Sequence, residues 1–260
     1  MGISHLISIV GAGPGDPELL TVKALKRLQD ADVVLYDALV GNEMLELTKA
    51  GAVKKYVGKL CNDGQNPKTR QDGIHNEFLL WAAEDKKVVR LKSGDPMIFG
   101  RGAEEIRFCK ENNLNFEVIP GVTAAVAGSS LFSIPLTERC KNNMVLFSCG
   151  RLGKKGIPGA ETVLNVLNQG CPVVLYMGLN NLLPYSNELL KNGISSAVPV
   201  QILSKISQAD QKHYSTTIGK ISEFLKENEP ETPSTIIIGE YAKPIEGNLK
   251  IQQLEKVLTI

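Results

Sequence analysis

Short apolar runs alternate with stretches of helical periodicity along the first half of the chain. Residues 6–10 and 33–36 are apolar enough for buried strands, and between them Leu20, Ala24 and Leu28 recur at helical spacing. This alternation indicates an α/β fold. It continues with a short helix near Met44, strands at 54–57, 88–91 and 116–119, a polar loop at 61–70, and helices at 71–83 and 102–113.

The second half repeats the alternation, but its last strands are closely spaced. Because such spacing leaves little room for crossover helices, a mixed sheet is expected. A turn near Pro120 separates the halves, so we expect two α/β domains, residues 1–119 and 120–260. Small residues after that turn, 122–128, allow either tight helix packing or close approach of a ligand. The predicted strands are 144–148, 172–177, 200–203, 213–218 and 235–238, and the predicted helices end near 168 and span 182–192.

Composition narrows the possible functions. A chain of 260 residues with 43% apolar residues can build one large domain or two modest ones. Its net charge of +1, without a basic tract, argues against nucleic acid as a partner. Five cysteines with no C-x-x-C spacing suggest reduced thiols and no disulfide framework. With no signal peptide, membrane segment or lipidation pattern at the start, we expect a cytoplasmic protein that does not bind membranes.

The stretch from Val88 to Glu105 combines a strand, a tight turn and a helix. Such a junction lies at the carboxyl end of a strand, where open α/β sheets bind ligands. It carries Asp95, and a spacing of three places Arg101 and Glu104 on one helical face. Arg101 could clamp a ligand carboxylate through paired hydrogen bonds, or it could simply pair with Glu104.

The first loop, residues 11–17, is rich in glycine and resembles a dinucleotide-binding turn. Asp37, at the end of the next strand, would then hold a ribose, although it could also cap a turn. Pro14 removes a backbone donor from this loop, however, and Asp16 adds a negative charge where phosphates would lie, although with Pro17 it also suits a helix start. The loop is better suited to a ligand that is not an anion, such as a sulfonium cofactor.

Seven ordered motifs resemble the tetrapyrrole (corrin/porphyrin) methyltransferase family, and within it the uroporphyrinogen-III C-methyltransferases. The Gly-Arg-Gly-x-Glu-Glu sequence after Gly-Asp-Pro is typical of that subfamily. The motifs are spread over most of the chain, at residues 10–16, 31–37, 57–59, 90–105, 120–124, 134–139 and 174–178.

The resemblance implies a fold, a cofactor and an activity. It predicts two α/β domains with S-adenosylmethionine in the cleft between them, commonly in a homodimer. The implied reaction is C-methylation of uroporphyrinogen III to precorrin-2, through precorrin-1, on the route to sirohaem and cobalamin. The matched cofactor-binding positions are Pro14, Ser93, Gly94, Asp95, Ile98, Thr123, Ala124 and Met177. The matched acid/base positions are Asp37 and Lys59, and those expected to handle the tetrapyrrole are Arg101, Glu104 and Arg139.

Some positions depart from the family pattern, and other functions stay open. Ser93 replaces a usual glycine, Glu138 a usual histidine, and Ile206-Ser207 a usual Gly-Thr, while the loop after Lys59 is longer and lacks its histidine. The alternatives are a methyltransferase for another tetrapyrrole intermediate, a nicotinamide-dependent oxidoreductase, and a non-catalytic binding module. No metal is expected, because His5, His75 and His213 show no ligand spacing.

Overall fold

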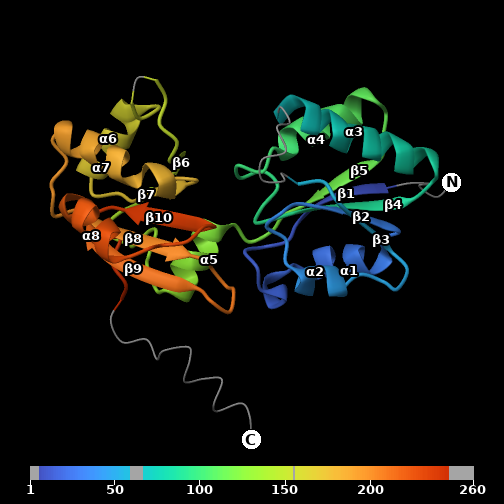
Figure 1. The fold of residues 1–260 in the computed structure, drawn as a ribbon, viewed down its shortest axis with the longest axis horizontal. Helices are drawn as coiled ribbons and strands as arrows, with labels where there is room; N and C mark the ends of the chain where they lie inside the picture. Colours follow the sequence, from blue (N-terminus) through green and yellow to red (C-terminus); the bar gives the residue numbers. More distant parts are fainter. Residues whose placement is uncertain (1–5, 59–66, 155, 246–260) are drawn as a thin grey trace, which may run out of the picture. The chain divides into compact units, whose positions relative to one another are not determined.

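The computed structural model describes residues 6–58, 67–154 and 156–245. The chain divides into two compact units, Met1–Ala124 and Ala125–Ile260, each built on its own sheet (Figure 1). The division follows Ala124, whereas the sequence placed it after residue 119. Both units combine strands and helices, as expected for the α/β class.

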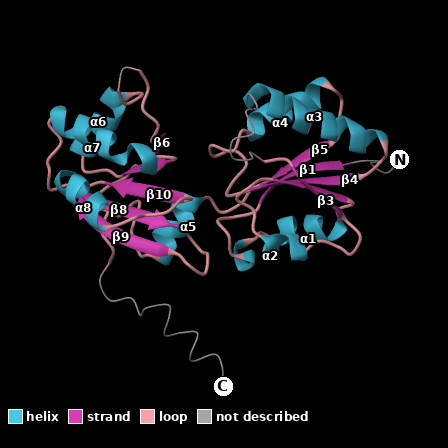
Figure 2. Ribbon diagram, viewed as in Figure 1, coloured by secondary structure: helices cyan, strands magenta, loops and turns pink. Residues whose placement is uncertain are grey.

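The first unit contains a five-stranded parallel sheet in the order β3-β2-β4-β1-β5. The register pairs Val10 of β1 with Leu91 of β4 and with Ile119 of β5. Helices α1 and α2 cover one face, and α3 and α4 cover the other (Figure 2). The strands are β1 (Leu6–Gly11), β2 (Val33–Tyr36), β3 (Val53–Tyr56), β4 (Lys87–Lys92) and β5 (Phe116–Ile119), and the helices are α1 (Val22–Asp30), α2 (Asn42–Glu46), α3 (Pro67–Ala83) and α4 (Gly102–Glu111).

Side chains of β4 alternate between the two layers of this sandwich. Val89 and Leu91 pack with α1 and α2, while Val88 packs with α3 and α4. Since successive strand residues point to opposite faces, Arg90 and Lys92 share the α3/α4 face with Val88. A central strand therefore carries two charges into a layer that is largely apolar.

The second unit contains a mixed sheet in the order β6-β7-β10-β8-β9, which confirms the expectation of a mixed sheet. Only β6 and β7 pair in parallel among its ladders in the described residues. One face packs against α6, α7 and α8. Helix α5 lies close to Leu203 of β8 and to Ile206 just after it, since a Cβ added to Gly128 would lie 2.6 Å from the Leu203 side chain and 3.0 Å from that of Ile206. The elements are α5 (Ala124–Leu131), β6 (Leu146–Cys149), α6 (Ala160–Asn168), β7 (Val173–Tyr176), α7 (Leu182–Lys191), β8 (Pro199–Ser204), β9 (Lys212–Thr217), α8 (Ile221–Glu227) and β10 (Ser234–Ile238).

Three sequence predictions need correction. Residues 67–70, expected in a loop, begin α3. Asp16 and Pro17 start only a 3₁₀ turn, Pro17–Leu19, and α1 begins separately, where the Thr21 hydroxyl accepts a hydrogen bond from Ala24 N at 3.1 Å. Helix α8 was not predicted. Within the described residues, no helix is both long and apolar enough to cross a membrane.

Candidate active site

The first sheet reverses the direction of its connections between β1 and β4. The chain leaves β1 through α1 to reach β2 on one side, and it leaves β4 through α4 to reach β5 on the other. Open α/β sheets bind ligands at such a switch point, outside the carboxyl ends of the strands. The loops that meet there are residues 12–16 and 93–101.

Glycines bring the ends of β1, β4 and β5 into direct backbone contact. Gly94 N donates to Gly13 O at 2.7 Å, and Gly13 N donates to Gly94 O at 3.2 Å. A Cβ added to Gly121 would lie 2.2 Å from the Gly94 oxygen, and one added to Gly11 would lie 2.6 Å from it. Because backbone cannot yield as a flexible side chain can, only glycine fits at Gly11 and Gly121.

Asp95 holds this turn together from within. Its Oδ1 accepts a hydrogen bond from Met97 N at 2.8 Å, and its Oδ2 accepts one from Gly121 N at 3.1 Å. The Asp95 carbonyl also accepts from Ile98 N at 3.3 Å. The carboxylate therefore ties the turn after β4 to the segment after β5, and it fixes where Gly94 lies.

Most other predicted cofactor positions gather around the same turn. Pro14 is buried beside Gly13, and Ser93 is partly exposed just before Gly94. Thr123 is buried next to Gly94, since a Cβ built on Gly94 would lie 3.8 Å from the Thr123 Cα atom. Ala124 follows it as the last residue of the first unit. The described part of this unit thus brings these predicted positions together.

Asp37 lies at the carboxyl end of β2, where two cations from β4 meet it. Arg90 Nη2 donates to Asp37 Oδ1 at 2.7 Å, and Lys92 Nζ lies 3.9 Å from Asp37 Oδ2. The Asp37 side chain is 30% exposed, whereas those of Arg90 and Lys92 are 2% and 4% exposed. The Asp37 carboxylate is therefore accessible to solvent, while the two cations that bind it are buried in the protein interior.

Glu105 of α4 lies behind these cations. Its Oε1 accepts from Arg90 Nε at 3.0 Å and from Lys92 Nζ at 2.9 Å, and its side chain is 0% exposed. Burial alone would lower the pKa of Arg90, but Glu105 and Asp37 raise it overall. Burial and the neighbouring Arg90 lower the pKa of Lys92, against the opposing effect of both carboxylates.

Sequence analysis missed Arg90, Lys92 and Glu105. The available signal was a period of two: Arg90 and Lys92 occupy same-face positions in a stretch whose other residues from Val88 onward, Val88, Val89 and Leu91, are apolar. A charge predicted to be buried requires a partner of opposite sign, but this signal does not say which acidic residue supplies it.

Arg101 and Glu104 pair with each other in this structure. Arg101 Nε donates to Glu104 Oε1 at 2.9 Å, and Nη2 donates to Oε2 at 2.6 Å. Hydrogen bonding from Arg101 lowers the pKa of Glu104. Both side chains are more than 40% exposed, and Arg101 precedes α4 with a left-handed φ of 60°. The guanidinium is thus exposed at the switch point with a bidentate partner already in place.

Two of the remaining predicted residues, Arg139 and Met177, belong to the second unit. Arg139 is exposed in a turn that Glu138 and Asn142 close, and Glu138 pairs with Lys141 at 2.7 Å. Met177 follows β7 in the second unit, is 44% exposed and has a φ of 56°. Lys59 lies outside the described residues.

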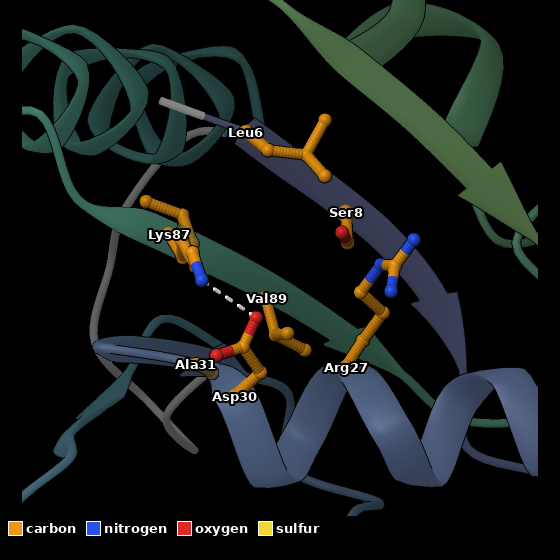
Figure 3. A pocket seen from close by; sticks show the side chains of 8 residues that line it. Leu6, Ser8, Arg27, Asp30, Ala31, Lys87 and Val89 are labelled. Atoms are coloured by element: carbon orange, nitrogen blue, oxygen red, sulfur yellow. Dashed lines mark hydrogen bonds and ion pairs between the residues drawn. The ribbon is translucent and has the colours of Figure 1, made fainter. Parts of the chain in front are cut away.

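A separate pocket of about 200 Å³ opens at the opposite end of the first sheet, where β1 and β4 begin (Figure 3). Its charged side chains already have partners: Lys87 pairs with Asp30 at 2.8 Å, and Arg27 pairs with Glu117. Among the described residues, no group of three His, Cys, Asp or Glu side chains could hold a metal ion.

The fold and the glycine-lined turn define a class, an α/β protein with a ligand site at the switch point of its first sheet. The family of Tetrapyrrole (Corrin/Porphyrin) Methylases matches residues 6–222, and the chain belongs to this family. The family expected from the sequence motifs is therefore confirmed.

Individual relatives are similar over nearly the whole chain. A uroporphyrinogen-III C-methyltransferase of Priestia megaterium is 38% identical, and the match covers 90% of this chain and 97% of that protein. A siroheme synthase of Psychrobacter arcticus is 43% identical over 90% of this chain, but this chain spans only 42% of its length. A Thermus thermophilus uroporphyrin-III C-methyltransferase, solved with S-adenyl homocysteine, has a TM-score of 0.75 and 35% identity, covering 90% of this chain and 97% of that one.

Proposed function

We propose that this protein transfers methyl groups from S-adenosylmethionine to carbon atoms of uroporphyrinogen III, forming precorrin-2 through precorrin-1. The observation that carries the proposal is the match to the uroporphyrinogen-III C-methyltransferase of Priestia megaterium, because that match covers 97% of the relative's length. Precorrin-2 leads to both sirohaem and cobalamin. The further steps implied by the name siroheme synthase are not assigned to this chain.

The turn at the switch point fits the proposed cofactor. S-adenosylmethionine supplies a methyl group on a positively charged sulfur. The loop after β1 carries no cation and includes Pro14, which cannot donate a backbone hydrogen bond, so it suits a cationic ligand better than a phosphate. Gly94, whose φ of 67° favours glycine, lets a ligand approach the backbone beside Thr123.

The reaction then requires positioning and a proton acceptor. As the new carbon–carbon bond forms and the carbon–sulfur bond breaks, the pyrrole ring becomes cationic and must lose a proton. Asp37 is our candidate acceptor, because it is a partly exposed carboxylate at the carboxyl end of β2. Arg90 holds Asp37 through a charge-assisted hydrogen bond at 2.7 Å, which restricts its orientation.

The acidic tetrapyrrole requires cations at its binding surface. Arg101 is the strongest candidate, because its guanidinium is exposed beside the cofactor turn. To bind a substrate carboxylate, Arg101 must release Glu104, its present partner. Arg139 and Lys59 are proposed for the same task on the basis of the family motifs. A homodimer, also suggested by the resemblance, can be tested by light scattering in solution.

Incubation with labelled S-adenosylmethionine and uroporphyrinogen III, followed by mass analysis of the tetrapyrrole, tests this function. We expect a product that has gained two methyl groups, with a singly methylated species appearing first. No incorporation into uroporphyrinogen III would contradict the proposal. The same assay with a later corrin intermediate tests the alternative substrate. The reason to test it is the similarity to a cobalt precorrin-4 methyltransferase, with a TM-score of 0.80 at 28% identity.

A further inference from the structure

The face of the first sheet beneath α3 and α4 contains a group of charges, here called the β4 cluster and defined as Asp37, Arg90, Lys92 and Glu105. On this face Ile7, Ile9, Val33, Leu35 and Val88 form an apolar layer with Ile74 and Phe78 of α3. Arg90, Lys92 and Glu105 are as deeply buried as these neighbours.

The β4 cluster is a chain of contacts that ends at the site. Glu105 lies innermost and contacts both cations through the same oxygen, Oε1, at 3.0 and 2.9 Å. Arg90 also donates to the Leu35 and Leu91 carbonyls at 3.3 Å, so its guanidinium is fixed on several sides. Asp37 lies at the outer end, where it contacts both cations and reaches solvent.

Stability is a poor explanation for this arrangement. Removing charges from water is costly, and the attraction between them offsets that cost only when their hydrogen bonds are complete. Glu105 Oε2 is buried and accepts no hydrogen bond from any residue that the structure describes. Burying the Glu105 carboxylate in this network therefore costs free energy of folding, and a role other than stability is needed to explain it.

We infer that Glu105 is a positioning residue for methyl transfer, which acts by holding Arg90 and Lys92 so that they orient the Asp37 carboxylate. This inference rests on the proposed function, in which Asp37 accepts the proton. Glu105 is fully buried, and the hydrogen bonds and ion pairs that the structure describes for its side chain go to Arg90 and Lys92, so its influence on Asp37 passes through these two cations. Its neutral analogue, glutamine, keeps the size of the side chain but cannot balance them.

The test is a double-mutant cycle between Glu105→Gln and Asp37→Asn in the full chain. Asp37→Asn should lower kcat by about 100-fold, the effect of losing a general base. Glu105→Gln should lower kcat by about tenfold, because a misplaced group reacts more slowly. The KM for S-adenosylmethionine and the dissociation constant of S-adenosylhomocysteine should change less than about twofold for Glu105→Gln, because these report binding rather than proton transfer. The double variant should be no slower than Asp37→Asn alone, since coupled residues are not additive.

Glu117→Gln is the matched control. Glu117 also holds two cations, Lys23 and Arg27, but it lies on β5 outside the β4 cluster. Glu117→Gln should leave kcat within about twofold of the parent value. The control therefore shows whether a fall in kcat for Glu105→Gln is specific to the β4 cluster or follows the loss of any carboxylate that pairs with two cations.

Each outcome decides between the two claims. A fall in kcat for Asp37→Asn without one for Glu105→Gln, or fully multiplied effects in the double variant, would overturn the inference and leave the proposed function intact. An unchanged kcat for Asp37→Asn would overturn the inference together with the role of Asp37 as proton acceptor, whereas the proposed function itself fails only if the parent enzyme transfers no methyl group to uroporphyrinogen III. If Glu105→Gln does not fold, Lys92→Gln with Glu105→Gln removes one charge of each sign, and the same cycle with Asp37→Asn then applies. Wild-type kcat in that variant would also refute the positioning role.

Discussion

At the scale of single residues, the first unit separates charges that are buried from charges that meet water. Arg90, Lys92 and Glu105 are almost fully buried, and their contacts are fixed by the packing around them. Arg101 and Glu104 form a bidentate pair that is exposed. Exposed pairs contribute little to stability, typically about 0–1 kcal/mol, so Arg101 can exchange its partner for a substrate carboxylate at small cost.

Arg101→Ala should therefore impair catalysis more than cofactor binding. We expect kcat/KM for the tetrapyrrole to fall roughly 10- to 100-fold, the loss expected for a charge-assisted contact of about 1.5–3 kcal/mol. Calorimetry should find the affinity for S-adenosylhomocysteine nearly unchanged. Arg107→Ala is the control and should have little effect, because Arg107 is an exposed cation of α4 six residues after Arg101. Equal loss of cofactor affinity and turnover would refute this division of roles.

Glu117 makes the first unit sensitive to acid. Burial opposes its ionisation, but hydrogen bonds from Arg27, Lys23 and Ser8 lower its pKa to about 2. Because the folded pKa lies below the unfolded value, the stabilisation is present above about pH 4.5 and is lost as the pH falls toward 2. This linkage is worth on the order of 3 kcal/mol at neutral pH.

Glu117→Gln should lower the free energy of unfolding by a similar amount at pH 7. Near pH 2.5 the variant and the parent should have nearly equal stability, because the parent has by then lost most of this contribution. Urea unfolding at both pH values measures the difference, with the exposed Glu18→Gln as the control. A difference that does not shrink in acid would contradict the assignment.

Residues at the ends of strands were easier to predict than residues inside them. Asp37 and Asp95 follow apolar runs, where ligand sites are expected, and the family motifs selected Arg101 and Glu104 as well. Arg90 lies within residues 88–91, which were correctly predicted as a buried strand, but it was not predicted as a site residue. Its significance depends on Glu105, fifteen positions away, and local periodicity does not reveal such a pairing.

At the scale of elements, hydrophobic periodicity predicted where most strands and helices lie. The residues at which they begin and end depend on capping and packing, which periodicity does not show. Residues 116–119 were predicted as a strand and form β5 with the same limits. Helix α1 begins later than predicted because Thr21 caps it, and Leu20 thus lies before the helix. Helix α8 was missed although Ile221 and Phe224 are buried three residues apart, because that stretch is short and only a 3₁₀ turn, Ile218–Lys220, separates it from β9.

The glycine junction at the ends of β1, β4 and β5 predicts a strong effect of Gly121→Ala. The added Cβ would lie 2.2 Å from a carbonyl oxygen, so the backbone must move, at a cost of about 1–3 kcal/mol. We expect a lower melting temperature and weaker binding of S-adenosylhomocysteine.

Gly73→Ala provides the control for that substitution. Gly73 lies in α3, where an added Cβ would have no neighbour within 4 Å. Alanine favours helix more than glycine does, so this variant should match the parent or be more stable by up to about 1 kcal/mol. A harmless Gly121→Ala would show that the junction tolerates a side chain.

At the scale of the whole molecule, the chain forms two compact units on separate sheets, one parallel and one mixed. The first carries the switch-point turn, the β4 cluster and most of the predicted site residues. The second carries Arg139 and Met177. Its fold was predicted from the spacing of its strands, but not the order β6-β7-β10-β8-β9, in which the last strand in sequence lies at the centre.

A ligand that binds only the folded protein raises its stability. S-adenosylhomocysteine at 100 times its dissociation constant should add about 2.7 kcal/mol and raise the melting temperature by several degrees. NAD and NADP, tested in the same way, should produce no shift, because the loop after β1 lacks the features of a pyrophosphate site. A shift with either nucleotide and none with S-adenosylhomocysteine would favour the oxidoreductase alternative.

The sequence alone determined the class of fold, the family and the candidate residues at strand ends, because periodicity and short motifs are local properties of the chain. Tertiary structure decided which charges share a buried face and which glycines touch. Those facts depend on strands distant in sequence becoming neighbours, as β4 does with β1 and β2. Burial then decides how much each contact contributes in free energy, and for this reason Glu105, which the sequence did not single out as a site residue, becomes important in the folded protein.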